Sequence, residues 1–439
     1  MEKSVYIETY GCSANQNNSE IIAGILSKAG FLITQNEKLA DIIIINSCIV
    51  KGKTESKIKR RIQDLKPWSN QKSHLLIIAG CMAETDWKKI KRINPNAVFL
   101  GINHIKDVLN LIKDWQENQL NEKKQQAYLS ERFEEKLILP KVPQNKIISI
   151  TQIAEGCSGN CSYCKTRLAK GNLRSYPQED IVKSIENDLQ NGVKEVWLTS
   201  QDNAAYGIDR SKKSELPELL KRILALKHRF KLRLGMANPN NILPILDELI
   251  EIYKNKKMFK FLHIPVQSAS NSVLKHMNRY YTIEDAGRII KKFRKEIPDI
   301  TIATDIIVGY PTETEEDHKK NLEFIKNYKP DILNLSKFSS HKQTPAGKLK
   351  VLPKSIVRKR TKELMQLHRE TARENKTKFL GKIIKVLVDK RVPNTEKLHQ
   401  ARDDNYNLVI VKCDKADLGK EIKVKITNLG LHTIIGERI

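Results

Sequence analysis

Apolar and polar positions alternate along the first 115 residues in a way that predicts strands and helices in turn. Four short apolar runs have the length of buried strands, and the segments between them repeat apolar residues at helical spacing. The predicted strands are 5–9, 41–45, 74–79 and 97–100. The predicted helices are 17–28, 54–65 and 84–93. After Asp41, strand 41–45 is a continuous run of Ile, as is typical of a parallel sheet covered on both faces, so we expect an α/β domain over residues 1–115.

A polar stretch separates this domain from a longer α/β region. Residues 116–142 are rich in Gln, Glu and Lys and have little periodicity, so they are predicted to be a linker. Residues 143–372 repeat strand and helix patterns six times, which favours a partial (β/α)6 barrel over an eightfold one. Its predicted strands are 147–154, 195–199, 231–236, 259–265, 300–308 and 332–338. Its predicted helices include 179–191, 216–226, 242–253, 283–296 and 315–327.

The last segment of the chain has a different pattern. Residues 373–439 contain strand-like runs and turns but no long helical repeat. The predicted strands are 382–389, 406–412 and 420–426. We therefore expect a small β-barrel, a kind of domain that often binds nucleic acids on a strand face.

The charge of the chain points to a partner. Of the 439 residues, 78 are Lys or Arg and 51 are Asp or Glu, which gives a net charge of +27. This excess predicts a polyanionic partner, most often nucleic acid; the alternative is a composition rich in Lys throughout. There is no run of 18 apolar residues, so no transmembrane helix is expected. The start of the chain lacks the features of a secretory signal, which favours a cytoplasmic protein.

Three of the seven cysteines form a C-x-x-x-C-x-x-C run. Cys157, Cys161 and Cys164 follow the apolar run 147–153 directly. Three thiolates on a four-iron cluster leave one iron open, and an open iron can bind and cleave a small molecule. Structural zinc is the alternative, but it needs four ligands that usually arrive as paired C-x-x-C units, and the chain has no second such unit.

Three further cysteines each follow a predicted strand of the first domain. Cys12, Cys48 and Cys81 should converge, because the carboxyl ends of parallel strands meet at one edge of a sheet. The alternative is three separate small buried side chains. The remaining cysteine, Cys413, follows a strand-like run and is predicted to lie in a core.

The run Glu155–Pro177, EGCSGNCSYCKTRLAKGNLRSYP, resembles the methylthiotransferases of the radical S-adenosylmethionine superfamily. Those enzymes combine an N-terminal three-cysteine domain, a radical core and a small β-barrel called TRAM, and all three parts are expected here in that order. The runs Gly11–Glu20 and Cys164-Lys-Thr are similar to the archaeal and eukaryotic branch, which acts on N6-threonylcarbamoyladenosine in tRNA.

The resemblance implies two [4Fe-4S] clusters and S-adenosylmethionine as cofactors. Catalytic Cys157, Cys161 and Cys164 would hold the cluster that binds S-adenosylmethionine, and Cys12, Cys48 and Cys81 an auxiliary cluster that carries sulfur. Cofactor contacts are implied at Tyr163, Gln201, Asp202, Asn203, Gln267, Asp305 and Gly309. The implied reaction is methylthiolation of C2 of N6-threonylcarbamoyladenosine at position 37 of the tRNA anticodon loop.

Other functions stay open at this point. They are methylthiolation of isopentenyladenosine in tRNA, methylthiolation of a ribosomal-protein aspartate, and a non-enzymatic iron–sulfur or zinc protein that binds RNA. The electron donor and the sulfur donor are unknown, and a monomer is the default.

Several basic segments are candidates for holding tRNA phosphates, with a solvated charged face as the alternative for each. They are 51–61, 165–174 and 354–362, and in the predicted β-barrel 382–390 with Arg402. Tyr406 is expected to pack the barrel rather than to stack on a base. One departure from the family is the run Ser339–Ala346, which lacks the Arg that many relatives have before Thr-Pro-Ala.

Overall fold

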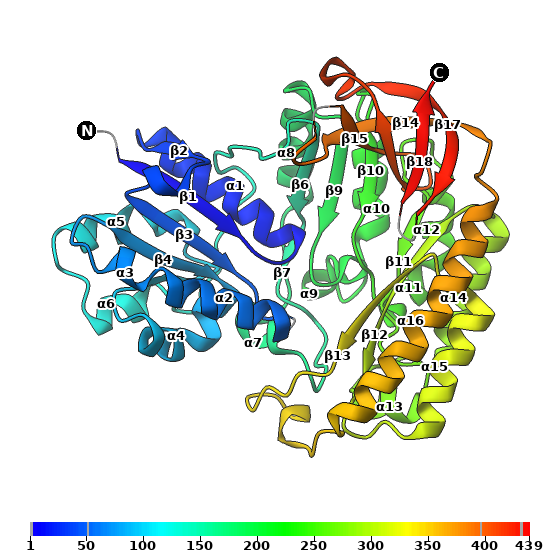
Figure 1. The fold of residues 1–439 in the computed structure, drawn as a ribbon, viewed down its shortest axis with the longest axis horizontal. Coiled ribbons are helices and arrows are strands. Elements are labelled where there is room, and N and C mark those ends of the chain that lie inside the picture. The colour runs from blue at the N-terminus through cyan, green and yellow to red at the C-terminus, as the bar shows by residue number, and fades with distance from the viewer. Residues whose placement is uncertain (1–2, 51, 396, 431–432) are drawn as a thin grey trace. The chain divides into compact units, whose positions relative to one another are not determined.

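The computed structural model describes residues 3–50, 52–395, 397–430 and 433–439, and the chain forms two compact units (Figure 1). The first unit contains the residues up to Gln144 together with Ile150–Cys157 and Cys164–Asp180. The second contains Asn145–Ser149, Ser158–Tyr163 and the chain from Ile181 onwards. Across the described residues, every helix is too short or too polar to cross a membrane.

The first unit is built on a five-stranded parallel sheet, as predicted. Its strands lie in the order β2-β1-β3-β4-β5, and all neighbours pair in parallel. They are β1 (Ser4–Thr9), β2 (Leu32–Thr34), β3 (Ile42–Ser47), β4 (Leu75–Gly80) and β5 (Val98–Leu100). The edge strand β2 was not predicted, because three residues are too short to show a periodic pattern.

Helices cover both faces of this sheet, which is why residues 42–45 of β3 and 75–79 of β4 are all apolar. Successive residues of β3 point to opposite faces: Ile42 and Ile44 pack in one apolar cluster with α1 (Ser13–Lys28) and α5 (Val108–Gln116). Ile43 and Ile45 pack in another, with α2 (Gly52–Asp64) and α4 (Cys81–Ile93).

The polar stretch after α5 is ordered against the sheet domain. It contains helix α6 (Glu122–Ala127), whose Gln125 side chain pairs with the backbone of Phe99 in β5. The Phe99 N–H donates to Gln125 Oε1 at 2.9 Å, and Gln125 Nε2 donates to the Phe99 carbonyl at 2.6 Å. A carboxamide thus takes the place of a sixth strand at this edge.

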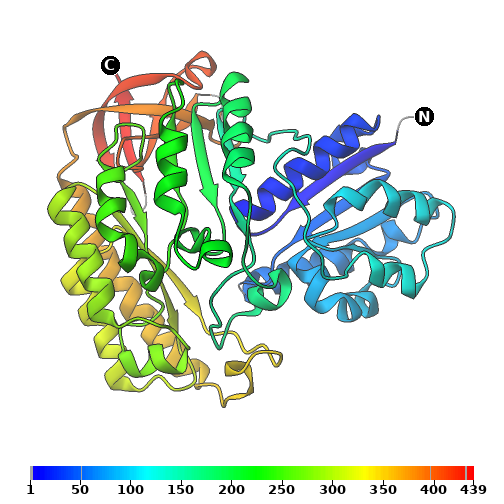
Figure 2. The ribbon, with the colours of Figure 1, turned by 180° about the vertical axis from the view of Figure 1, so that it is seen from behind.

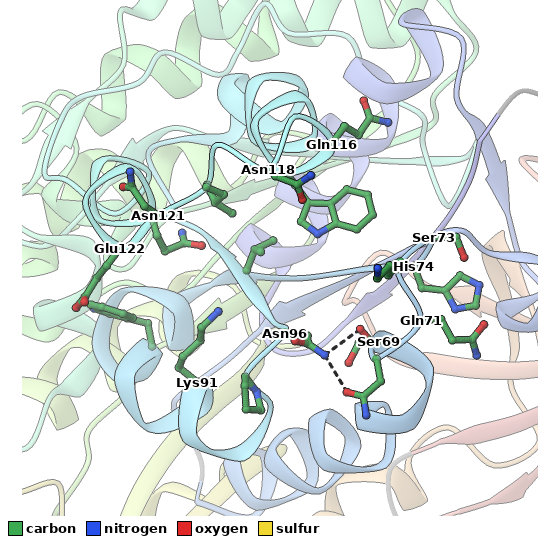
Figure 3. A pocket seen from close by; sticks show the side chains of 18 of the residues that line it. Ser69, Gln71, Ser73, His74, Lys91, Asn96, Gln116, Asn118, Asn121 and Glu122 are labelled. Carbon is green, nitrogen blue, oxygen red and sulfur yellow. Dashed lines mark hydrogen bonds between the residues drawn. The ribbon is translucent and has the colours of Figure 1, made fainter.

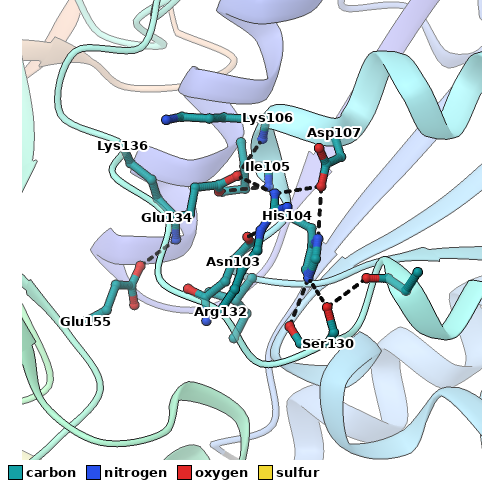
Figure 4. A network of polar contacts seen from close by, with 12 residues as sticks. Asn103, His104, Ile105, Lys106, Asp107, Ser130, Arg132, Glu134, Lys136 and Glu155 are labelled. Atoms are coloured by element: carbon teal, nitrogen blue, oxygen red, sulfur yellow. Dashed lines mark hydrogen bonds and ion pairs between the residues drawn. The ribbon is translucent and has the colours of Figure 1, made fainter.

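Polar contacts also hold the segment that follows α6 (Figure 4). The Glu134 carboxylate accepts hydrogen bonds from the N–H groups of Ile105 and Lys106, each 2.9 Å long. Arg132 donates to the Asn103 carbonyl at 2.8 Å and to the Asp107 carboxylate at 2.6 Å. Because these contacts are polar and use backbone groups, they leave no apolar periodicity in the sequence.

Ser130, His104 and Asp107 in this network are arranged like a hydrolase triad, yet their hydrogen bonds are structural. His104 Nδ1 lies 2.9 Å from Asp107 Oδ2, and Nε2 lies 3.2 Å from Ser130 Oγ. However, Nε2 also lies 2.8 Å from the Ser130 carbonyl oxygen, which can only accept. Nε2 is therefore a donor and cannot act as the base for the hydroxyl, which itself donates to the Ala127 carbonyl.

Five of the six strands of the predicted partial barrel lie wholly in the second unit, and the remaining strand begins there (Figure 2). One sheet has the order β10-β9-β6 and the other β11-β12-β13. The strands are β6 (Ile148–Gln152), β9 (Glu195–Thr199), β10 (Lys231–Leu234), β11 (Phe261–His263), β12 (Thr301–Val308) and β13 (Ile332–Lys337). The Ala237 N–H donates to the His263 carbonyl at 2.9 Å and so joins the segments that continue β10 and β11.

Helices follow the strands of the partial barrel. They are α8 (Gln178–Gln190), α10 (Leu216–Leu224), α12 (Leu246–Tyr253), α14 (Ile283–Glu296), α15 (Glu315–Tyr328) and α16 (Lys354–Thr377). The single helix predicted over 242–253 is wrong in its first turn. The chain forms α11 (Pro239–Ile242) and a 3-10 turn (Leu243–Ile245) before α12, because Pro244 cannot donate the hydrogen bond of a continuous helix.

The chain ends in a closed five-stranded barrel with the strand order β14-β15-β16-β18-β17. Its strands are β14 (Ile383–Arg391), β15 (Leu398–Arg402), β16 (Leu408–Lys412), β17 (Glu421–Leu429) and β18 (Ile434–Arg438). The prediction of a small barrel is confirmed, although β15 and β18 were not among the predicted strands. Cys413 lies in the barrel core, also as predicted.

Tyr406 is buried, as expected of a packing residue, but it packs against the partial barrel and not in the core of the terminal barrel, which corrects the prediction. Its ring lies 4.9 Å from the rings of both Phe259 and Phe261 and 6.3 Å from that of Trp197. The Arg233 guanidinium lies 5.0–5.1 Å from Trp197, Phe261 and Tyr406. Tyr406, which comes from the terminal barrel, therefore packs against the Arg233 cation of β10 together with the rings of β9 and of the β11 segment.

The close contact between α1 and the segment after α6 yields a stability prediction. A Cβ added at Gly24 would lie 2.1 Å from the Pro140 carbonyl oxygen. Gly24→Ala should therefore destabilise the protein by about 1–3 kcal/mol, measured by urea unfolding. Ser27→Ala, at an exposed position of the same helix, is the control and should change little. Helix propensity alone would make Gly24→Ala more stable than the unaltered protein. That outcome would show that the segment containing Pro140 is not held against α1.

Candidate functional site

The three strand-end cysteines lie together at the carboxyl edge of the first unit's sheet. Cys12 caps α1 after β1, Cys48 follows β3, and Cys81 is the first residue of α4 after β4. These three strands are neighbours in the sheet. A Cβ added at Gly11 would lie 3.0 Å from Cys48 Sγ, so Cys48 packs against the backbone next to Cys12. Gly11 has a φ of +113°, and both features require glycine there.

Buried amides fix the loops that carry these thiols. Asn15 Nδ2 donates to the carbonyls of Tyr10 and Ser47, each at 2.8 Å, which ties the end of β1 to the end of β3. Asn46 Nδ2 in turn donates to the Asn15 carbonyl at 2.7 Å. Cys12 Sγ lies 3.9 Å from Asn15 Oδ1. The same side chains that satisfy the strand ends therefore set the positions of Cys12 and Cys48.

A buried ion-pair group lies beside the thiols. Glu155 accepts from Lys136 at 2.6 Å and from Lys170 at 3.0 Å, and all three side chains are almost fully buried. Burial raises the pKa of the Cys81 thiol well above its ordinary value, and Lys170 is the main opposing influence. Burial lowers the pKa of Lys170, but the Glu155 carboxylate, Cys81 and Cys12 raise this pKa by more than burial lowers it. Lys170 therefore stays charged.

Lys170 corrects the expectation that residues 165–174 hold phosphates. Lys165, like Lys170, is buried, and it pairs with Asp86 and with Glu55, the latter at 3.7 Å. In sequence, Lys170 lies inside the quoted cysteine motif, but nothing in the pattern distinguishes a buried lysine from a solvated one. The structure therefore moves it from the RNA-binding candidates to the surroundings of the auxiliary thiols.

The second set of cysteines lies on a single eight-residue loop. Cys157 follows β7 (Ala154–Glu155), and Cys164 caps α7 (Lys165–Lys170). All three of its cysteines are partly exposed, as a cluster that meets a small molecule requires. A Cβ added at Gly156 would lie 1.9 Å from the Asn172 carbonyl oxygen, so glycine is needed where this loop begins.

Arg279 connects this loop to the barrel strands, and it was not among the predicted site residues. Its Nη1 donates to Cys161 Sγ at 3.4 Å, and Nη2 donates to Asn238 Oδ1 and to the Pro265 carbonyl. Asn238 in turn donates from its N–H and from Nδ2 to Asp202 at 3.0 and 2.7 Å. No pattern in the sequence marks Arg279, because a single arginine cannot be distinguished there from a solvated one.

The three predicted cofactor contacts that follow β9 differ in what they can offer. Both Asp202 oxygens already accept hydrogen bonds, from Asn238 and Asn241, and burial raises the pKa of this carboxyl. In contrast, Gln201 Oε1 and Asn203 Oδ1 are buried and have no hydrogen-bond partner among the described residues. Unpaired buried acceptors fit a ligand with amino and hydroxyl groups, which S-adenosylmethionine has.

The other predicted cofactor residues lie along the ends of β11 and β12. The Gln267 N–H donates to the Asp305 carbonyl at 2.7 Å, and Gln267 has a left-handed φ of +64°. The Asp305 carboxylate lies 2.6 Å from His263 Nε2. Gly309, with a φ of +76°, follows β12, and Tyr163 packs in an apolar cluster with Met277 and Tyr310. Contact with a cofactor stays a prediction for these residues.

Each donor set consists of three cysteines, which is the number of thiolates that an open four-iron cluster takes. Within the described residues, no three His, Cys, Asp or Glu side chains are gathered as one metal ion would require. A four-iron cluster places each thiolate on a different iron. The charge of Lys170 beside Cys12 and Cys81, and of Arg279 on Cys161, suits anionic thiolates.

The ion-pair group beside the thiols yields a pH-dependent prediction. Burial raises the pKa of Glu155, but Lys136 and Lys170 outweigh it and bring it from 4.5 to about 2. The carboxylate therefore stabilises the fold above pH 4.5 and loses this effect as the pH falls towards 2. Glu155→Gln should lower the free energy of unfolding at pH 7 by about 3–5 kcal/mol, because two buried ammonium groups lose their partner.

The difference in the free energy of unfolding between the unaltered protein and Glu155→Gln should shrink by about 1.4 kcal/mol per pH unit below 4.5. It is measured by urea unfolding at pH 7 and pH 3.5. Glu131→Gln is the matched control, since its side chain is 70% exposed. A difference that does not depend on pH would contradict the assignment of Glu155 as a buried, charged carboxylate.

Three family models match successive parts of the chain. Uncharacterized protein family UPF0004 matches residues 4–101, the Radical SAM superfamily residues 151–325, and the TRAM domain residues 377–437. Among solved structures, the radical S-adenosylmethionine methyltransferase TsrM from Kitasatospora setae is similar with a TM-score of 0.56. The match covers 79% of this chain and 75% of TsrM. The two sequences are 14% identical, so the likeness concerns the fold alone.

Full-length relatives are more closely similar. A "Probable threonylcarbamoyladenosine tRNA methylthiotransferase" of Archaeoglobus fulgidus is 38% identical over 99% of this chain and 98% of its own length. The "Threonylcarbamoyladenosine tRNA methylthiotransferase" of Homo sapiens is 34% identical over the whole of this chain and 74% of its own length. With all three domains matched in order, this chain belongs to the threonylcarbamoyladenosine tRNA methylthiotransferase family.

Proposed function

We propose that this protein transfers a methylthio group to C2 of N6-threonylcarbamoyladenosine at position 37 of tRNA. The observation that carries the proposal is the presence of two separate three-cysteine sets in one chain. One set lies on the loop 157–164, and the other lies at three neighbouring strand ends. The names of the full-length relatives support the choice of substrate. The Radical SAM superfamily implies a [4Fe-4S] cluster and S-adenosylmethionine, and the second cluster is part of this proposal.

The target carbon explains why the chemistry needs a radical. C2 of adenine carries a hydrogen that no side-chain base removes readily. When bound at Cys157, Cys161 and Cys164, the cluster with S-adenosylmethionine supplies a radical that can activate such a position. The protein's own contribution is orientation: Arg279 holds the Cys161 sulfur, and Gln201 and Asn203 present free acceptors to the cofactor.

The other cysteine set is assigned to the sulfur. Cys12, Cys48 and Cys81 would hold an auxiliary [4Fe-4S] cluster with one iron free to carry the sulfur that is transferred. Cys81 and Cys12 raise the pKa of Lys170, which means that its ammonium group lies close to both sulfurs. The ammonium therefore offsets part of the negative charge of the thiolates. Glu155 and Lys136 keep this ammonium in place.

The terminal barrel offers a basic strand face for tRNA. Lys385 of β14 and Lys423 of β17 lie directly opposite each other, and Lys425 follows on the same outward side. Lys385 is paired with Glu421, whereas Lys423 and Lys425 have no carboxylate within 4.0 Å among the described residues, so these two lysines can contact a polyanionic ligand. Arg402 does not belong to this face, because it pairs with Asp389 and lies 4.4 Å from the Tyr406 ring.

Variants of single cysteines test the division of labour between the two sets. Cys157→Ala should abolish reductive cleavage of S-adenosylmethionine. Cys48→Ala should keep that cleavage and lose methylthio transfer, and Cys413→Ala, in the barrel core, should lose neither. The measurements are 5′-deoxyadenosine formation and mass spectrometry of tRNA nucleosides. Normal methylthio product from Cys48→Ala would refute the two-cluster assignment.

The nucleoside analysis also tests the substrate. Cells that lack the protein should lose 2-methylthio-N6-threonylcarbamoyladenosine and keep the unmodified precursor. Loss of a methylthio group from isopentenyladenosine or from a ribosomal-protein aspartate instead would assign the enzyme to one of those substrates.

Charge reversal on the barrel face tests the RNA contact. Lys423→Glu with Lys425→Glu should weaken tRNA binding and reduce the slope of log K against log salt by about 1 per lysine, because counterion release falls. Binding is measured by fluorescence anisotropy at several salt concentrations. Lys415→Glu, an exposed lysine outside the β14–β17 strand pair, is the control. An unchanged slope in the double variant would place the RNA elsewhere.

A further inference from the structure

A large concavity lies in the first unit, at the edge of the sheet opposite the thiols. It has a volume of about 1160 Å³ and is formed by residues within 69–74, 87–98 and 115–125 together with Lys3 and Asp41. Figure 3 shows Gln116 and Asn118 on one side, Gln71 and His74 on another, and Lys91 towards α4. We call this concavity the amino-edge groove, because its residues surround the starts of β4 and β5.

The amino-edge groove is separate from the site already described. His74 precedes the first residue of β4, and Cys81 follows the last. A six-residue strand spans about 20 Å, so a ligand in the groove cannot touch the thiols. No step of the proposed reaction uses the residues that line it.

The groove has an unusual charge for this part of the chain. Five basic residues and two acidic residues line it. The basic ones are Lys3, Lys72, Lys88, Lys91 and Arg92. Among the residues that the structure describes, none of these five has a carboxylate within 4.0 Å, whereas Lys59, Arg61 and Lys124 elsewhere in the unit are paired.

Among the described residues, neither of the two acidic residues, Asp41 and Glu122, forms an ion pair with a basic residue of the groove. Asp41 accepts hydrogen bonds from the N–H of Ser4 at 2.7 Å and from its hydroxyl at 2.9 Å. Lys91 Nζ donates to the Ala97 carbonyl at 3.0 Å, which satisfies a hydrogen but offers no counter-charge. The groove therefore presents a net positive charge to whatever enters it.

Two of the four tryptophans of the chain line the groove, each beside a cation. Lys3 Nζ lies 5.5 Å from the centre of the Trp115 ring, and Lys88 Nζ lies 5.4 Å from that of Trp87. Core packing fixes both rings, because Trp115 packs with α1 and α5 residues and Trp87 meets Phe99 edge to face. Fixed aromatic rings beside unpaired cations are the combination that binds bases and phosphates of a single strand.

Carboxamides supply the remaining polar surface. Asn96 Nδ2 donates to the Ser69 carbonyl at 3.2 Å and to Asn70 Oδ1 at 2.8 Å, so this wall is ordered (Figure 3). The opposite wall is held by the Gln125 contacts with β5. Exposed amides such as Asn118 and Asn121 can both donate to and accept from the edges of unstacked bases.

We propose that the amino-edge groove binds an unpaired segment of the tRNA substrate other than the nucleoside that is modified. The proposal rests on the proposed function for the choice of RNA. An acidic protein is the other occupant that the charge would accept. Tryptophans and carboxamides favour RNA, since an acidic protein surface needs cations but neither stacking rings nor base-edge partners.

The test uses the full-length protein with a ten-residue oligouridylate that carries 4-thiouridine and a fluorescent label. Ultraviolet crosslinking followed by peptide mass spectrometry should give crosslinks within 69–74, 87–96 or 115–122. Lys72→Glu with Lys88→Glu should remove these crosslinks, weaken binding about tenfold and flatten the salt slope by about 1.4. Lys28→Glu with Lys106→Glu, two exposed lysines of the same unit outside the groove, is the matched control and should stay within twofold.

Trp115→Leu tests stacking separately from charge. It should weaken oligouridylate binding about tenfold without changing the salt slope. Because Trp115 also contacts the core, its fold is checked by circular dichroism, and the double lysine variant keeps the test valid if Trp115→Leu unfolds. Crosslinks confined to residues 382–438, with unaltered binding by the groove variants, would overturn the proposal. A third outcome is that the oligonucleotide binds only to the terminal barrel, while polyglutamate binds in the groove. That result would assign the groove to an acidic partner and would also overturn the proposal.

Activity separates this inference from the proposed function. The groove variant should methylthiolate an anticodon stem-loop fragment at the normal rate and show a raised KM for whole tRNA. Absence of methylthio product with the unaltered protein, together with crosslinks in the groove, would refute the proposed function and leave the groove as an RNA site.

Discussion

Burial of the parallel sheet on both faces is the constraint on which the first unit depends. Parallel strands end at one edge, and helices cover the pleats of β3 and β4 with Ile side chains, so polar chemistry has access only at the two edges. The thiols lie at the carboxyl edge, where short loops between strand and helix hold Cys12, Cys48 and Cys81. The amino edge carries the groove with its unpaired cations. The sheet thus separates two polar surfaces by the length of a strand.

The fold could be predicted wherever burial leaves an apolar pattern. Strands β3, β4 and β9 lie close to their predicted bounds because each is a run of buried residues between turns. Strand β15, with the sequence LHQAR, has too few apolar residues to be distinguished from a loop. The segment after α6 could not be predicted to be ordered, because Glu134 and Arg132 hold it through backbone groups that leave no trace in composition.

The candidate site was predictable in its cysteines and not in its charges. A cysteine at a strand end can be recognised from sequence, since the strand itself can. Lys170 and Arg279 could not be assigned, because a long cationic side chain in a sequence is most often solvated. Only the structure shows that Lys170 is held by Glu155 and that Arg279 reaches Cys161. The 78 Lys and Arg residues therefore include cations in buried pairs as well as cations left unpaired at a surface.

The aromatic group around Arg233 has a consequence for how the protein is made. Phe259, Phe261 and Trp197 emerge from the ribosome well before Tyr406, the ring that completes their packing. Until the terminal barrel is synthesised, the Arg233 cation and the three rings around it lack the cover that Tyr406 provides. The partial barrel therefore cannot reach its final packing during translation. A chain that stops before residue 406 leaves an apolar surface uncovered, and chaperones and proteases act on such surfaces.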